Sequence, residues 1–363
     1  MRNIYIWMLT LVLSLSAWMG TAVANEDWPT IYTMSNEPSG NAILAFRQLG
    51  DTLVPAGRFP TEGKGTGGGL GNQGALVLTE DGEMLIAVNP GSDDISVFRV
   101  DGRRLTLVDR VSSGGSRPIS VTTHEDWVYV LNAGGVGNIT GFELTNHDKL
   151  KPIPGSTRPL SGSTTAPAQI EFTPSGDTLV VTEKATQTID TYAVDEEGIT
   201  TGPVAQRSNG ATPFGFSFTR RGVLIVSEAF GGAPNASAVS SYALHKGTFT
   251  LLSGSVPSSQ TAACWIVITK NGKFAYASNT GSHNISSYRI SRNGTLTLHE
   301  AVAASTGNGP IDMALSRSSR SLYVLNSASN SIQVFRVNRS NGHLAGGAGV
   351  SGLPTGTNGL VAR

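Results

Sequence analysis

Two glutamates end short β-type segments at positions where five comparable segments end in asparagine. Glu183 ends the segment that begins at Thr178, Glu228 ends the segment that begins at Val223, and Lys184 directly follows the first glutamate. Two carboxylates in one cleft can have separated pKa values and divide acid and base roles between them. If the fold brings them together, Glu183 or Glu228 is a candidate general base, and Lys184 a candidate to stabilise an oxyanion.

Other polar side chains occupy equivalent positions and are candidates for the same site. Five asparagines end the remaining segments, and two more polar residues lie in the strands that precede such segments. We expect ligand contacts from Asn36, Asn89, Asn132, Gln169, Asn279, Asp312 and Asn326. A second interpretation stays open, because Asn and Glu at a repeated strand end can bond to nearby backbone groups and fix a loop without touching a ligand.

Motifs for cofactors, metals and covalent catalysis are weak in this sequence. The glycine-rich stretch 63–74 contains Gly-x-Gly-x-x-Gly, but nucleotide binding needs a helix next and residues 75–78 indicate a strand. The six histidines are scattered, and Cys264 has no adjacent basic residue to lower its pKa. We expect no cofactor and no metal, and we interpret 63–74 as either a cover over the ligand site or an ordered connection.

The segments that carry these residues recur seven times along the chain. They end at residues 36, 89, 132, 183, 228, 279 and 326, so successive ends lie 43 to 53 residues apart. This is the period of a four-stranded propeller blade with variable loops. An alternating strand such as Ile95–Val100 follows, and then a hairpin turn such as Asp101-Gly102. The sequence predicts an all-β fold, a seven-bladed β-propeller of four-stranded antiparallel blades.

The two ends of the chain are expected to share one blade. The segment at Ile31 lacks the inner strand that opens the other six repeats, whereas the C-terminal residues Asn358–Arg363 fit such a strand. We expect the C-terminal strand to close the ring inside blade one, which removes two open sheet edges. One propeller domain is predicted over residues 25–363.

Residues 1–24 are typical of a signal peptide. Arg2 precedes the apolar run Ile6–Trp18, and Ala22-Val23-Ala24 is a small-residue cleavage site. The run is shorter than the roughly 20 residues of a spanning helix, so no membrane span is expected after cleavage. The expected location is periplasmic or secreted. Because Cys264 is the only cysteine, no intramolecular disulfide can form.

Several segments resemble those of a known family: Gln169–Gly176, Val181–Lys184, Ser227–Gly232 and Thr261–Trp265. With the repeat and its closure, the chain resembles a secreted branch of the seven-bladed propeller lactonases. That family includes 6-phosphogluconolactonase and the fungal carboxymuconate cyclases. Its characterised enzymes typically carry a histidine in the loop that enters the inner strand corresponding to the segment at Gln169. The matching stretch here is 166–169, Ala-Pro-Ala-Gln, which has no histidine.

The resemblance implies an exported lactonase-like propeller that binds a small ligand or a protein on its funnel face. The alternative is an active lactone hydrolase or cyclase acting on a sugar lactone or a carboxymuconate-type lactone. Lys and Arg number 26 and Asp and Glu also number 26, with no basic stripe, so nucleic acid is not an expected partner. We expect a monomer whose partner is a lactone or sugar-like molecule, or a protein.

Overall fold

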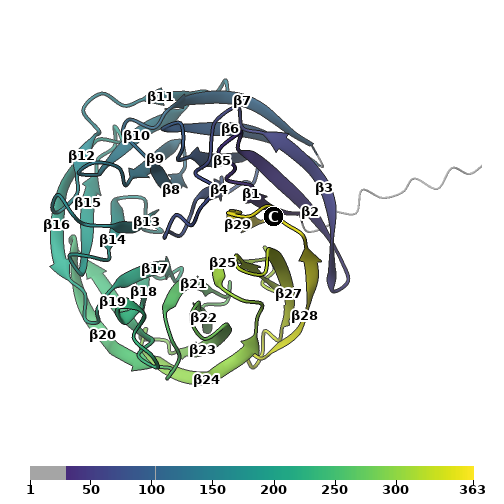
Figure 1. Cartoon of the computed structure of the whole chain (residues 1–363). Helices are drawn as coiled ribbons and strands as arrows, with labels where there is room; N and C mark the ends of the chain where they lie inside the picture. Colours follow the sequence, from purple (N-terminus) through teal and green to yellow (C-terminus); the bar gives the residue numbers. More distant parts are fainter. Residues whose placement is uncertain (1–29, 103) are drawn as a thin grey trace, which may run out of the picture.

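The computed structural model describes residues 30–102 and 104–363. These residues form seven antiparallel sheets arranged as blades around a central axis (Figure 1). The all-β, seven-bladed fold expected from the repeat is confirmed. The signal peptide predicted for residues 1–24 lies outside the described residues.

Each blade runs from an inner strand beside the axis to an outer strand at the rim. The inner strands are β4 (Leu76–Leu78), β8 (Pro118–His124), β13 (Pro167–Phe172), β17 (Pro213–Phe218), β21 (Ala263–Ile268), β25 (Pro310–Leu315) and β29 (Asn358–Ala362). The second strands are β1 (Thr30–Met34), β5 (Met84–Asn89), β9 (Trp127–Asn132), β14 (Thr178–Glu183), β18 (Val223–Glu228), β22 (Phe274–Asn279) and β26 (Ser321–Asn326). The third strands are β2 (Ala42–Leu49), β6 (Asp94–Asp101), β10 (Asn138–Leu144), β15 (Thr188–Val194), β19 (Ala238–His245), β23 (Asn284–Ile290) and β27 (Ser331–Val337). The outer strands are β3 (Thr52–Pro60), β7 (Arg104–Ser112), β11 (Leu150–Pro152), β16 (Thr200–Arg207), β20 (Thr248–Pro257), β24 (Leu296–Ser305) and β28 (Leu344–Ser351).

Blade 3 departs from this pattern because its outer strand is interrupted. β11 pairs with one end of β10, and the additional strand β12 (Arg158–Pro159) pairs with the other end. The short 3-10 helix η1 (Phe230–Gly232) follows β18 and is the helical element of the described ranges. Within residues 30–102 and 104–363, no helix has the length and apolar character needed to cross a membrane.

The C-terminal strand closes the ring, as expected from the sequence. β29 pairs antiparallel with β1, with Ile31 opposite Ala362 and Tyr32 opposite Val361. The hydroxyl of Thr33 donates to the carbonyl oxygen of Gly359 at 2.5 Å. The two ends of the described chain are therefore hydrogen-bonded to each other within blade 1.

Packing between blades explains why the second strands are so apolar. All six residues of β5, and likewise of β14, β22 and β26, are buried, because each blade is covered on both sides by its neighbours. Buried tyrosines also join adjacent blades through hydrogen bonds. The hydroxyl of Tyr129 donates to the carbonyl of Gly198 at 2.6 Å, and that of Tyr276 donates to Gly342 at 2.8 Å.

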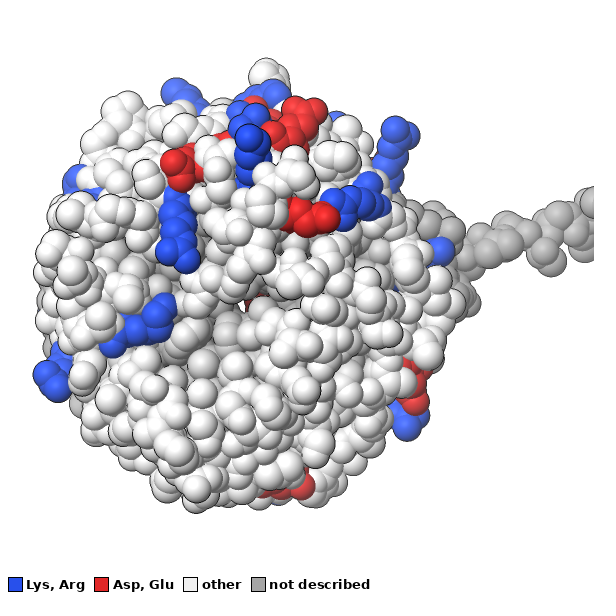
Figure 2. Space-filling model, in the orientation of Figure 1, with Lys and Arg blue, Asp and Glu red and all other residues white. Residues whose placement is uncertain are grey.

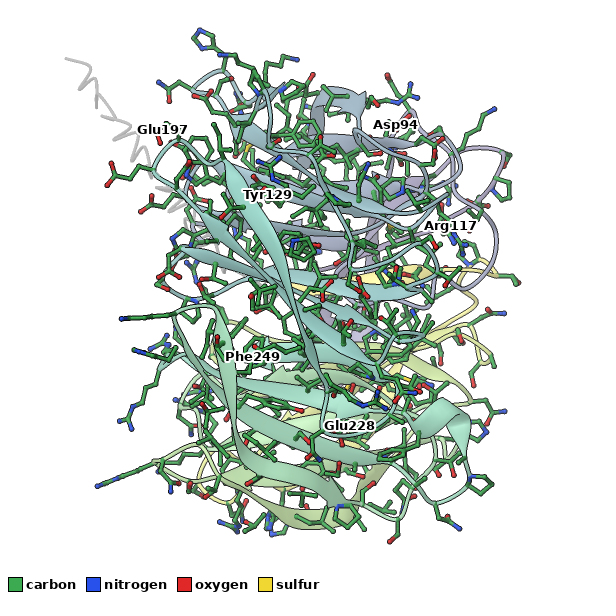
Figure 3. All side chains as sticks on the ribbon, turned by 90° about the vertical axis from the view of Figure 1, so that its left-hand side faces the viewer. Asp94, Arg117, Tyr129, Glu197, Glu228 and Phe249 are labelled. Atoms are coloured by element: carbon green, nitrogen blue, oxygen red, sulfur yellow. The ribbon has the colours of Figure 1, made fainter. Side chains whose placement is uncertain are left out.

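The ring has two different faces. We call the side where inner strands begin and second strands end the loop face, and the opposite side, built from strand-connecting turns, the hairpin face. In the side view of Figure 3, Arg117 lies at the loop face and Glu197 at the hairpin face. Figures 1 and 2 view the molecule from the loop face.

Candidate functional site

Glu183, one predicted catalytic residue, is fully buried at the end of β14. Its carboxylate accepts hydrogen bonds from the backbone N–H of Ser161 at 2.9 Å, from Thr186 Oγ1 at 2.5 Å and from Thr188 Oγ1 at 2.9 Å. Burial acts to raise its pKa, but bonds from Asp190, Ser161 and Thr186 outweigh this effect and lower it. The contacts of Glu183 fix the loop that enters blade 4.

Glu228 has the same role in blade 5. It is fully buried and accepts hydrogen bonds from the N–H of Gly210 at 2.8 Å and from the hydroxyls of Ser240 and Ser255, the latter at 2.7 Å. Burial raises the pKa of Glu228 despite these bonds. Among the described residues, no hydrogen bond or ion pair joins Glu183, Glu228 and Lys184, so the three predicted catalytic groups are not brought into contact.

Lys184 points toward the axis rather than toward either glutamate. Its ammonium group donates to the carbonyl oxygens of Gly71 and Pro167, the latter at 2.8 Å, and lies 4.8 Å from the ring centre of Phe214. Burial lowers the pKa of Lys184 to about 8. Lys184 therefore ties the glycine-rich stretch 63–74 to blades 4 and 5.

The predicted asparagine contacts are all fully buried: Asn36, Asn89, Asn132, Asn279 and Asn326. The side-chain amide of Asn89 donates to Asp94 at 2.7 Å and to Ser96 at 2.8 Å. Asn279 repeats this pair of bonds in blade 6 with Asn284 and Ser286, both at 2.8 Å. These contacts fit the interpretation in which each asparagine fixes the loop of its own blade. A ligand contact at these positions stays a prediction.

The glycine-rich stretch lies across the axis at the loop face. The Gln73 side chain donates to the carbonyl of Ile266 at 2.9 Å and accepts from the N–H of the same residue at 3.1 Å. The indole N–H of Trp265 donates to the carbonyl of Asn72 at 2.8 Å. Figure 2 shows only a narrow central opening on this face. The sequence allows residues 63–74 to be interpreted either as a cover over the ligand site or as an ordered connection between blades. These hydrogen bonds fit the ordered connection.

Beneath this closure, a cavity of about 960 Å³ opens toward the hairpin face. Its walls come mainly from β4, β8 and β13 and from the turns that follow them, with Met313 and Leu360 on the opposite side. We call it the axial cavity. Its polar lining includes Gln73, Gln169, Glu171 and Asp312.

Gln169 and Glu171 share one side of β13, because alternate residues of a strand face the same way. The amide of Gln169 donates to the carboxyl group of Glu171 at 2.8 Å and to the carbonyl of Phe216 at 3.0 Å, and it accepts from the N–H of Phe216 at 2.7 Å. Burial raises the pKa of Glu171 to about 8, although bonds from the Phe218 N–H and Gln169 act against this rise.

Asp312 brings a second carboxyl group to the axial cavity. Its side chain is buried, and its Oδ1 accepts a hydrogen bond from the N–H of Met313 at 2.8 Å. Burial raises the pKa of Asp312 well above its usual range. Glu171 is therefore largely neutral at pH 7, and burial favours the neutral form of Asp312 as well. A neutral carboxyl group can both donate and accept a hydrogen bond.

Two of the seven predicted ligand contacts, Gln169 and Asp312, thus line the axial cavity. Glu171 and Gln73 were not singled out from the sequence. Glu171 could have been found from the sequence, because it lies two residues after Gln169 on one predicted strand and therefore faces the same side. No comparable signal exists for Gln73, since its partner Ile266 is 193 residues away.

A separate cluster near the rim could hold a metal ion. His299, Glu300 and His343 each offer one ligand atom, and these atoms lie within 4.8 Å of one another. Such a combination of imidazole and carboxylate ligands suits first-row transition metals. However, the Arg289 guanidinium lies 3.3 Å from His299 Nδ1 and places a positive charge beside the cluster. This cluster does not line the axial cavity.

Comparison with known proteins identifies a matching family profile and a shared fold. The profile of the family described as "Lactonase, 7-bladed beta-propeller" matches residues 30–152 and 236–350. A search of curated proteins found no match.

Solved structures share the fold at low sequence identity. A candidate 6-phosphogluconolactonase of Bacteroides fragilis is 19% identical, with a TM-score of 0.74 over 94% of this chain and 99% of that chain. The periplasmic gluconolactonase of Pseudomonas aeruginosa is 17% identical, with a TM-score of 0.73 over 92% and 98%. A Lactobacillus plantarum protein is 17% identical, with a TM-score of 0.75 over 93% and 99%. At this identity, the likeness establishes the fold alone.

Proposed function

Because the chain belongs to the family of seven-bladed β-propeller lactonases, we propose that it binds a small lactone or sugar-like ligand in its axial cavity. The observation that carries this proposal is the pair of carboxyl groups, Glu171 and Asp312, in a cavity of about 960 Å³. That volume suits a small molecule. Neutral carboxyl groups can donate to the carbonyl and hydroxyl oxygens of such a ligand.

We also propose that the protein acts outside the cytoplasm. Residues 1–24 support this location because they are typical of a signal peptide. The Pseudomonas aeruginosa protein with the same fold is named as periplasmic. A processed N-terminus near Asn25 in the exported protein, determined by N-terminal sequencing, would bear out the proposal. Retention of residues 1–24 in the cytoplasmic fraction would contradict it.

Ligand binding is tested by calorimetric titration with aldonolactones, muconolactones and their ring-opened acids. We expect Glu171→Leu, which removes the polar group but keeps the bulk, to weaken binding tenfold or more. The matched control is Glu197→Gln, an exposed change at the hairpin face that should leave affinity unaltered. Unchanged affinity in Glu171→Leu, together with loss of binding in Lys184→Met, would place the ligand at the loop face instead.

Hydrolysis of the lactone is a second candidate function, favoured by the pKa of Glu171 near 8. A carboxylate with this pKa could take a proton from water as the water attacks the lactone carbonyl. Turnover should then rise with pH up to about 8 and level off above it. Glu171→Gln should lower turnover by about 10²- to 10⁴-fold while binding persists. Equal turnover in this variant and the wild type would exclude Glu171 as the base.

A further inference from the structure

Charge is divided unequally between the two parts of this chain. Residues 1–198 contain 13 Lys and Arg but 23 Asp and Glu, whereas residues 199–363 contain 13 Lys and Arg but only three Asp and Glu. Those three acids are Glu228, Glu300 and Asp312, of which Glu228 and Asp312 are buried. The net charge of zero therefore conceals two oppositely charged regions.

The fold places these opposite charges on one surface, the hairpin face. Blades 5 to 7 present exposed cations on turns and strand ends there, which we call the basic sector: Arg220, Arg221, Lys246, Lys270, Lys273, Arg292, Arg317, Arg320, Arg336 and Arg339. Blades 2 to 4 present exposed acids there, which we call the acidic sector: Glu80, Asp81, Glu83, Asp101, Glu125, Asp126, Asp177, Asp195, Glu196 and Glu197. Four exposed cations of blades 2 and 3 lie beside them, Arg99, Arg104, Lys149 and Lys151, so acids outnumber cations in this sector by ten to four. By contrast, Figure 2 shows few charged side chains on the loop face over β17 to β28.

The basic sector is largely without counter-charges of its own. Five of the seven ion pairs within the described residues lie in blades 1 to 3, and one cation of the basic sector, Arg336, takes part in such a pair, with Asp51. A groove of about 380 Å³ between blades 5 and 6 is lined by five cationic residues and no acid: Arg220, Arg221, Lys270, Lys273 and Arg292. These charges are exposed and available to a partner.

We propose that the hairpin face binds the hairpin face of a second copy of this chain. The basic sector occupies three consecutive blades, the acidic sector occupies the next three around the ring, and blade 1 lies between them. A two-fold axis in the plane of this face, running from blade 1 to the boundary of blades 4 and 5, exchanges the sectors. Blade 6 then lies over the partner's blade 3, blade 5 over its blade 4 and blade 7 over its blade 2.

A second copy fits this surface better than a polyanion does. A long anion bound to the basic sector would meet ten exposed acids on the same face, whereas a second copy satisfies both sectors at once. Two-fold dimers are the commonest oligomers, and their interfaces require such a self-complementary surface. The net charge of zero imposes no overall repulsion between two copies, and its separation into two sectors favours this association.

The dimer would also affect access to the axial cavity, whose rim includes Glu80, Glu125 and Arg220 of the two sectors. In the proposed orientation, the openings of the two cavities face each other. Ligand exchange should therefore become faster as the dimer dissociates. Dimer formation is measured without ligand and lactone binding is measured separately. Either proposal can therefore be wrong while the other holds.

Sedimentation velocity of the purified protein over a range of salt concentrations tests the proposal. We expect a dimer at about 0.05 M salt and a monomer at about 1 M, because the Debye length falls to ~3 Å at 1 M. The variant R220E/R221E/K270E/K273E reverses four cations of blades 5 and 6, so that acids would face the acids of the partner's blades 3 and 4, and it should be monomeric. The variant E125K/D126K/E196K/E197K reverses four acids of blades 3 and 4, so that cations would face the cations of the partner's blades 5 and 6, and it should also be monomeric.

An equimolar mixture of these two variants decides the matter, because the reversed residues of one variant then face reversed residues of opposite charge in the other, and a heterodimer should form at low salt. The matched control is Arg207→Glu, which reverses an exposed cation on β16, away from both sectors, and should leave the dimer intact. Native circular dichroism and melting of each variant exclude misfolding. A wild type that is monomeric at 0.05 M salt, or variants that do not recombine, would overturn the proposal. Heparin bound by a wild type that stays monomeric would also overturn it and assign the basic sector to a polyanion.

Discussion

Glu171 and Asp312 are two carboxyl groups that line the axial cavity and have raised pKa values. Glu171 bonds to the Gln169 side chain, and Asp312 accepts the N–H of Met313, so both are held in fixed positions within one cavity. Their raised pKa values have the same first cause, which is burial. Raised carboxyl pKa values in a cavity are common at functional sites and less common in purely structural positions. The pKa of Glu228 is raised as well, but Glu183 and Glu228 do not line the axial cavity and their oxygens are bonded to neighbouring loops. Position as well as pKa therefore favours the axial cavity.

The pKa of Glu171 makes stability depend on pH in a defined direction. Below pH 4.5 the carboxyl group is protonated in both states, but between 4.5 and about 8 the folded state holds a proton that the unfolded state has lost. The free energy of unfolding should therefore fall as pH rises through this interval. Glu171→Gln should show a smaller fall, measured by thermal unfolding at several pH values. Identical pH profiles for the two proteins would contradict the raised pKa.

Glu228 should prove important for stability more than for ligand binding. In Glu228→Gln one carboxylate oxygen becomes an amide NH₂, which then faces either the Ser255 hydroxyl at the Oε2 position or the Gly210 N–H at the Oε1 position. We expect a loss of about 1–3 kcal/mol in the free energy of unfolding, measured by urea denaturation. The exposed control Glu197→Gln should change it by less than about 0.5 kcal/mol. A Glu228→Gln protein of wild-type stability that no longer binds ligand would instead support a direct role at the site.

At the scale of elements, two segments shape the site: the closing strand β29 and the connection 63–74. β29 supplies Leu360 and Val361 to the wall of the axial cavity. The connection closes the axis at the loop face. Gly74 within it has a φ of +81°, and a Cβ atom there would lie 2.9 Å from the hydroxyl of Ser120, so a larger residue would strain this turn.

Removing β29 should destabilise the whole ring. Truncation before Asn358 would leave β1 with an unpaired edge and would take away the Thr33 to Gly359 bond. We expect the loss of several kcal/mol, a large part of the ~5–15 kcal/mol that stabilises typical domains. Calorimetry of the truncated protein should show a much lower or absent transition. As a milder control, Thr33→Val should lower stability by only about 1 kcal/mol. An unaltered transition in the truncated protein would show that closure by β29 is dispensable.

At the scale of the molecule, regular spacing made the fold predictable from sequence. The seven predicted segment ends include Asn89, Glu183 and Asn326, and β5, β14 and β26 end at these residues. The site was harder to predict because its groups meet only in the closed ring. Gln73 reaches Ile266 across the axis, and burial rather than residue type changes the pKa of Glu171. The unequal numbers of acids and cations in residues 1–198 and 199–363 can be counted in the sequence. That these charges gather on the hairpin face depends on where the fold places the turns.

In the proposed complex, ligand enters the axial cavity from the hairpin face. The decisive experiment is a crystal structure of the protein with the lactone or ring-opened acid that binds most tightly. We expect the ligand within hydrogen-bond distance of Glu171 and Asp312, beneath the closure formed by Gln73. Ligand bound at the loop face beside Lys184 and Phe214, with the axial cavity holding only water, would contradict it.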